Sequence, residues 1–229
     1  QSMRAIYEIR ALAFEAIHEF FQIQQFKKLD PNIVTTSDCE GAGEVFTITT
    51  LDQTKGSHKD CTSSDVVPKP YSEDFFEKRA YLTVSSQLQL EALCAGMGKV
   101  YTTNPSFRAE PSETNRHVAC FTHVEWEIAF ITLTQLLDFN EDIIKYVIDY
   151  ILRKGMPALT LLDKFLSKGI IDKLETTIAK DFIRITYTDA LRIVTESYEQ
   201  IKAIHPSFEL DRKSTRLNSS HGYISYAVF

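Results

Sequence analysis

The sequence is short of cysteine, of long apolar runs and of excess positive charge, and each shortage excludes a class of protein. Its four cysteines, Cys39, Cys61, Cys94 and Cys120, are widely spaced and form no Cys-x-x-Cys pair. They predict free thiols in a reducing compartment, with neither a zinc site nor a disulfide framework. No apolar run reaches membrane-spanning length and no signal peptide is recognisable, so we expect a cytoplasmic protein with no membrane partner.

The charge and the composition indicate a folded, acidic protein. The 229 residues carry a net charge of −6, so no overall positive field indicates nucleic-acid binding. This argues only weakly against RNA, which local basic patches can hold. With 44% hydrophobic residues the chain can bury a sizeable core, and its length suits one domain or somewhat more.

The most informative segment spans residues 101–127, where the pattern predicts a strand, a polar loop and a return strand. Arg108 and Glu110 lie two residues apart, so on a strand both would point to the same sheet face. The return strand carries an aromatic residue, Phe121, and two alternating acids, Glu125 and Glu127. Cations, acids and a flat ring on one face suit a nucleoside triphosphate beside an amino acid. Taken singly, the same residues would indicate a surface ion pair and core packing.

This segment resembles motif 2 of the class II aminoacyl-tRNA synthetases, in the version found in the aspartate and asparagine enzymes. The matching pattern is Phe-Arg-Ala-Glu at 107–110, Arg-His at 116–117, and then an aromatic residue and an acid-x-acid strand end. The similarity runs to about residue 208 and is greatest to asparagine-specific members of the cytosolic eukaryotic or large-virus kind, through 81–88 and 122–125. The resemblance implies an α+β fold with a mostly antiparallel sheet flanked by helices, incomplete on its C-terminal side.

The resemblance also implies an activity. Enzymes of this kind activate an amino acid with ATP and transfer it to tRNA, so the expected partners are asparagine, ATP as a substrate, and the tRNA for asparagine. Magnesium is expected in the parent protein, with ligands outside this chain. No side-chain nucleophile is required, so catalysis would rely on positioning and electrostatics.

The family's site residues carry over onto the positions that match its motifs. Arg108 would be the catalytic residue, bridging the amino-acid carboxylate and the α-phosphate of ATP. The expected ATP-binding residues are Arg108, Glu110, Arg116, His117 and Phe121, and the expected amino-acid-binding residues are Glu40, Gln87 and Glu125. Outside the family context, Glu40 would be a solvated acid in a glycine-containing loop, and Gln87 a residue at a helix start that Ser85 or Ser86 caps.

Several positions bear on the substrate or depart from the family pattern. Leu90 stands three residues after Gln87, where aspartate enzymes carry a lysine that helps to pair the substrate carboxylate. Aspartate would lose a partner for its charge there, so an uncharged residue favours asparagine. Gln25 stands where the family usually has Gly, which would permit a left-handed turn. Asp30 stands where the family usually has Thr, and Cys120 where it commonly has Glu.

The first helix and the strand after it resemble motif 1, the subunit interface of the family. Apolar residues recur at helical spacing from Ile6 to Phe21, and a β-rich run at 33–36 follows Pro31. We therefore expect a homodimer with Phe20, Phe21 and Pro31 at its interface. A helix that packs on its own core is the alternative.

The chain after residue 130 indicates scaffold. We expect helices at 138–152, with Asn140 as N-cap, and at 158–165, 170–179 and 188–204, and a strand at 182–187. Neither a third motif with its phosphate-binding arginine nor magnesium-holding acids are recognisable. We therefore expect a partial catalytic domain at 1–208, inactive alone, and a non-homologous tail at 209–229, disordered or artefactual. The alternatives are an asparagine synthetase-like enzyme that activates aspartate, and a truncated non-catalytic paralogue.

Overall fold

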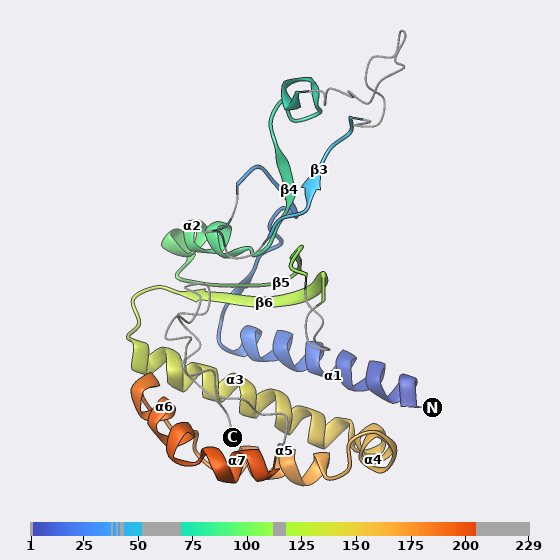
Figure 1. The fold of residues 1–229 in the computed structure, drawn as a ribbon, viewed down its shortest axis with the longest axis vertical. Helices are drawn as coiled ribbons and strands as arrows, with labels where there is room; N and C mark the ends of the chain where they lie inside the picture. Colours follow the sequence, from blue (N-terminus) through green and yellow to red (C-terminus); the bar gives the residue numbers. More distant parts are fainter. Residues whose placement is uncertain are drawn as a thin grey trace. The chain divides into compact units, whose positions relative to one another are not determined.

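The computed structural model describes residues 2–37, 39, 41, 44–51, 70–111 and 118–204. The chain divides into two compact units (Figure 1). The sheet unit contains residues 21–133, and the helical unit contains residues 1–20 together with the chain from Thr134 onward. Within the described ranges, no helix is both long enough and apolar enough to cross a membrane.

The longest strands of the sheet unit are β5 (Lys99–Phe107) and β6 (Cys120–Ile128), which pair antiparallel (Figure 1). Strand β1 (Lys27–Lys28) pairs in parallel with the other edge of β5, so the strand order is β1-β5-β6. The hairpin predicted from the sequence is thus present.

A second, smaller sheet in the same unit is antiparallel throughout. Its order is β2-β4-β3, from β2 (Val34–Thr35), β4 (Ala80–Leu82) and β3 (Thr47–Ile48). A short 3₁₀ helix, η1 (Tyr71–Glu73), precedes β4. β2 lies within the β-rich run at 33–36 that the sequence indicated, but it is shorter than that run.

Helix α2 (Gln87–Met97) begins at the helix start predicted for Gln87 and packs on β5 and β6. Leu90 is entirely buried in a cluster with Cys94 and Val100, and Leu29 and Ala129 pack against that cluster. The hydrophobic effect therefore fixes this helix on one face of the hairpin, where its first turn can reach the strand side chains.

Helix α1 (Ser2–Ile23) ends in a left-handed turn, as the family pattern predicts. Gln25 has φ 64°, and the N–H of Phe26 donates to the carbonyl of Phe21 at 2.9 Å. A residue with a β-carbon is strained in this region, which is where the family uses glycine. Phe21, in the last turn of α1, is fully buried, and its ring stacks on Tyr101 at a centroid distance of 4.2 Å.

The helical unit combines the start of α1 with α3 (Leu133–Lys154), α4 (Met156–Phe165), α5 (Ile170–Ile178), α6 (Tyr187–Glu196) and α7 (Tyr198–Ile204). Phe20 of α1 is buried against Phe139 and Tyr146 of α3, with ring centroids 5.4 and 5.3 Å apart. Ala5 packs with Ala158 and Leu162 of α4. Helix α1 therefore packs within its own chain, and the dimer interface stays a prediction.

Three secondary-structure predictions for the helical unit were wrong. Asn140 lies inside α3, which begins at Leu133, and the last predicted helix is two helices separated at Ser197. The predicted strand at 182–187 is irregular chain up to residue 186. Its main-chain N–H at Phe182 donates to Glu141 of α3 at 3.0 Å, so a side chain takes the place of a neighbouring strand.

Candidate active site

Strand register brings three candidate side chains of β6 to one face of the hairpin. Phe121, His123 and Glu125 alternate along the strand, so they share a face. Their cross-strand partners on β5 are Ser106, Asn104 and Thr102 respectively. This face, with the first turn of α2 beside it, is called the motif 2 face below.

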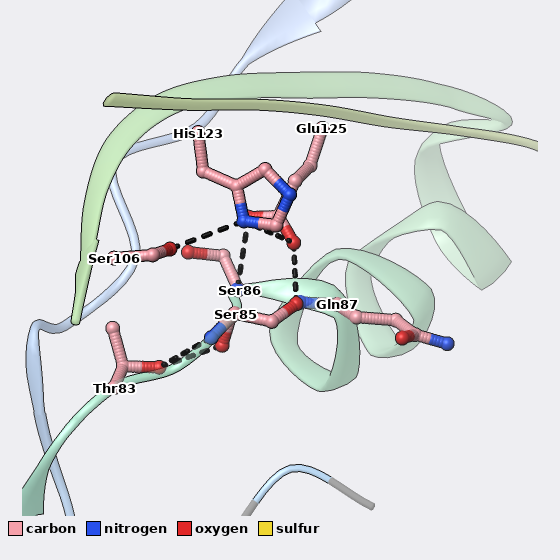
Figure 2. A network of polar contacts seen from close by, with 7 residues as sticks. All are labelled: Thr83, Ser85, Ser86, Gln87, Ser106, His123 and Glu125. Carbon is pink, nitrogen blue, oxygen red and sulfur yellow. Dashed lines mark hydrogen bonds and ion pairs between the residues drawn. The ribbon is translucent and has the colours of Figure 1, made fainter. Parts of the chain in front are cut away.

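Glu125 is held by the residues that lead into α2 (Figure 2). The hydroxyl of Ser85 donates to one carboxylate oxygen of Glu125, and the main-chain N–H of Ser86 donates to the other at 3.0 Å. The side chain of Glu125 is only 11% exposed. The two donors hold the two oxygens of the carboxylate, so its orientation is fixed at the start of α2.

Ser85 is itself fixed by the chain around it. Its hydroxyl accepts a hydrogen bond from the N–H of Gln87 at 3.0 Å, and its carbonyl accepts one from the hydroxyl of Thr83 at 2.6 Å. The main chain of Thr83 in turn accepts from the N–H of Phe107 at 2.9 Å. Of the two predicted caps, Ser85 provides the side-chain contact, whereas Ser86 occupies the N-cap position without a side-chain cap bond.

His123 lies between Glu125 and the other end of the motif 2 face. Its Nδ1 atom is 3.1 Å from the hydroxyl oxygen of Ser106 and 3.4 Å from a carboxylate oxygen of Glu125. Burial lowers the pKa of His123, the charge of Glu125 opposes this shift, and the charge of Arg108 reinforces it. The imidazole is therefore neutral at neutral pH.

Arg108 and Phe121 form the opposite end of the motif 2 face. The guanidinium carbon of Arg108 lies 5.6 Å from the centroid of the Phe121 ring. The Nε atom of Arg108 is buried and has no hydrogen-bond partner among the described residues. A guanidinium beside a ring, with a donor left over, suits an anionic ligand that carries a flat base.

The predicted strand position of Arg108 and Glu110 was wrong. β5 ends at Phe107, although the N–H of Arg108 still donates across the hairpin to the carbonyl of Ala119 at 3.1 Å. The next N–H, at Ala109, turns instead to the carbonyl of Glu44 at 2.7 Å, so the strand pairing stops. Glu110 is exposed beyond this point.

Gln87 lies at the start of α2 as predicted, and its side-chain amide donates to Glu91 one helical turn later at 2.9 Å. Glu127 is close to two further acids, Glu91 and Glu125. Burial, and then the charges of Glu91 and Glu125, raise the pKa of Glu127. This end of the motif 2 face is therefore rich in negative charge.

The remaining predicted residues are placed as follows. Glu40, Arg116 and His117 lie outside the described residues. Asn104 donates its side-chain N–H to the carbonyl of Pro31 at 2.7 Å, which ties the predicted interface proline to β5. Cys120 is exposed.

Within the part of the chain that the structure describes, no group of three or more His, Cys, Asp or Glu side chains is suited to a metal ion.

The sequence did not predict that Ser85 holds Glu125. Nor did it predict that His123 lies between Ser106 and Glu125 and contacts both. For His123 a signal was available, because two-residue alternation places it between Phe121 and Glu125 on the same face. Ser85 carried no comparable signal, because its partner is 40 residues away in the sequence.

Comparisons with known proteins agree on one family. A family model described as tRNA synthetases class II (D, K and N) matches residues 1–222. The asparagine–tRNA ligase of Clostridium tetani is 40% identical over 198 residues, 86% of this chain and 42% of that protein. That of Clostridium novyi is 42% identical over 193 residues, 84% of this chain and 41% of that protein. The chain thus spans about two fifths of the length of these relatives.

Solved structures show the same likeness. Asparaginyl-tRNA synthetase from Pyrococcus horikoshii, complexed with asparaginyl-adenylate, matches with a TM-score of 0.67 and 26% identity, over 86% of this chain and 38% of that chain. The Entamoeba histolytica enzyme, in complex with asparaginyl-adenylate, matches with a TM-score of 0.60 over 85% of this chain and 35% of that chain. At 23% identity the second likeness shows the fold alone.

Proposed function

This chain belongs to the class II tRNA synthetases (D, K and N), and we propose that it supplies part of the active site of an asparagine–tRNA ligase. Both the family and the α+β fold class predicted from the sequence are confirmed. The specific activity, the substrates and the partners are proposals, because the chain spans about two fifths of its curated relatives.

The observation that carries the proposal is the order of side chains along the motif 2 face. Arg108 and Phe121 lie at one end, Glu125 and the first turn of α2 lie at the other, and His123 lies between them. An aminoacyl-adenylate has the same order of groups: a base and a phosphate, then a carbonyl, then an amine and a side chain. A single extended ligand can therefore contact both ends of this face.

In the proposed first step, a carboxylate oxygen of asparagine attacks the α-phosphorus of ATP, and pyrophosphate leaves. Arg108 would stabilise the charge that develops on the phosphoryl oxygens, since a preoriented guanidinium needs little rearrangement during the reaction. Phe121 would stack on the adenine ring. In the second step a ribose hydroxyl of the tRNA takes the acyl group and AMP leaves.

Asparagine fits the acidic end of this face better than aspartate. Glu125 is hydrogen-bonded as a carboxylate, and Glu91 and Glu127 lie near it. An amide N–H can donate to such a group, whereas a second carboxylate would be repelled in a partly buried site. Leu90 offers no cation to offset that repulsion, because its side chain is entirely within the apolar cluster under α2.

Other parts of the proposal rest on family membership. A magnesium ion is expected to assist ATP in the parent enzyme, but the described residues supply no set of ligands for it, so no step is assigned to it. A cytoplasmic homodimer that binds the tRNA for asparagine is likewise proposed from the family.

The test is pyrophosphate exchange by the full-length parent enzyme with asparagine and with aspartate. We expect faster exchange with asparagine. Faster exchange with aspartate, accompanied by ammonia-dependent formation of free asparagine, would instead identify the synthetase-like alternative. The absence of exchange with either amino acid would favour a non-catalytic paralogue.

A further inference from the structure

The two oxygens of the Glu125 carboxylate each receive a donor from the chain that leads into α2. Ser85 supplies a hydroxyl to one oxygen, and Ser86 supplies a main-chain N–H at 3.0 Å to the other (Figure 2). Only one of these donors is a side chain that mutation can remove. The two donors together fix the rotation of the carboxylate about its last bond, and Ser85 is the one whose contribution can be tested by mutation.

The hydroxyl of Ser85 has no proton left for a ligand. A hydroxyl carries one proton and two lone pairs. Its proton is donated to Glu125, and a lone pair accepts the N–H of Gln87 at 3.0 Å. Ser85 is also buried, with 6% of its surface exposed. Ser85 therefore has no proton to donate to a bound amino acid, and its hydrogen bonds act on the site through Glu125 and Gln87.

We infer that Ser85 is a positioning residue that locks Glu125 to the start of α2, so that Glu125 and Gln87 recognise the amino-acid part of the substrate as one rigid unit. The inference rests on the proposed function. Groups held in productive geometry by their neighbours bind and discriminate better than mobile ones. Without the hydroxyl, the carboxylate of Glu125 can turn toward solvent, which weakens both its bond to an amide and its repulsion of a carboxylate.

The experiment measures binding of two non-hydrolysable probes to the full-length enzyme by calorimetry: asparaginyl- and aspartyl-sulfamoyl adenosine. Ser85→Ala should weaken the asparaginyl probe by about tenfold to a hundredfold, the usual range for a hydrogen bond to a charged group. It should change the aspartyl probe much less, so the preference for asparagine falls. Ser85→Thr, which restores the hydroxyl, should recover most of the preference.

Thr102→Val is the matched control. Thr102 lies directly across the hairpin from Glu125, is fully buried, and its hydroxyl has no partner among the described residues. Removing that hydroxyl perturbs the same neighbourhood without breaking a bond to Glu125, so the preference between the probes should stay unchanged. Ser85→Cys, which nearly keeps the volume while weakening the donor, gives an intermediate loss and serves if Ser85→Ala does not fold.

A double-mutant cycle with Glu125→Ala separates positioning from direct contact. If Ser85 acts through Glu125, adding Ser85→Ala to Glu125→Ala should cause no further loss of affinity for the asparaginyl probe. Additive losses would show that Ser85 does not act through Glu125 and would overturn the inference. If the wild-type enzyme binds neither probe, the proposed function is refuted. If the wild-type enzyme and the Ser85→Ala variant bind both probes equally well, only the role of Ser85 is refuted.

Discussion

Gln25→Gly should stabilise the sheet unit, because Gln25 occupies a backbone conformation that glycine adopts without strain. Gln25 has φ 64° at the end of α1, and its side chain is exposed. A left-handed residue with a β-carbon is disfavoured by about 1–2 kcal/mol. Glycine loses about 0.5–1 kcal/mol through its greater freedom in the unfolded chain. The expected net gain in the free energy of unfolding therefore lies between about 0 and 1.5 kcal/mol, with a central value of about 0.75 kcal/mol.

The measurement is urea unfolding followed by tryptophan fluorescence. Trp126 is the single tryptophan of the chain and its ring centroid lies 5.7 Å from that of Phe21, so its signal reports on the sheet unit near the turn. Gln25→Ala is the control, because it shortens the side chain but keeps the β-carbon and its strain. A glycine variant no more stable than the alanine variant would show that this turn is not strained.

Three further predictions concern the helical unit, the site histidine and the catalytic arginine. In Gly155→Ala the new Cβ would lie 2.8 Å from a methyl of Ile9 and 2.9 Å from a main-chain oxygen, so urea titration should show a loss of about 1–3 kcal/mol. Burial lowers the pKa of His123, so the unfolded chain binds the proton more readily; stability should fall as the pH drops below about 6.5. Urea titrations on either side of that pH will test this. The His123→Gln variant should lose less stability over the same change of pH. Arg108→Lys keeps the charge but not the planar fork, so pyrophosphate exchange should fall roughly a hundredfold, and full activity would refute the assignment.

The parts of the fold that could be predicted from the sequence are those that rest on local periodicity. The apolar stripe ending at Phe21 predicted α1, and alternation predicted the hairpin of β5 and β6. The segment at 182–187 showed the same alternation but is not a strand. Its main chain is bound by a side chain of α3, Glu141, and no local pattern records such a partner.

The candidate site divides in the same way. Phe121 and Glu125 could be placed on one face from alternation alone, and the structure places them there. The contact that holds Glu125 could not be predicted, because Ser85 reaches Glu125 only after the chain between them has folded into α2 and β5. The predicted roles of Arg108, Gln87 and Glu125 toward a ligand stay predictions.

The hydrogen bonds between Glu125 and the start of α2 also bear on the order in which the molecule folds. The N–H of Gln87 has a local partner in the hydroxyl of Ser85, but the N–H before it, at Ser86, takes its partner 39 residues later in the chain. This bond can therefore form only after β6 has joined the sheet, because it links residues that are 39 apart in the chain. The amino-acid end of the proposed site should assemble late in folding. Whenever that first turn opens transiently in the native protein, Glu125 loses its orientation, so the lifetime of a helical turn sets how long the site stays competent.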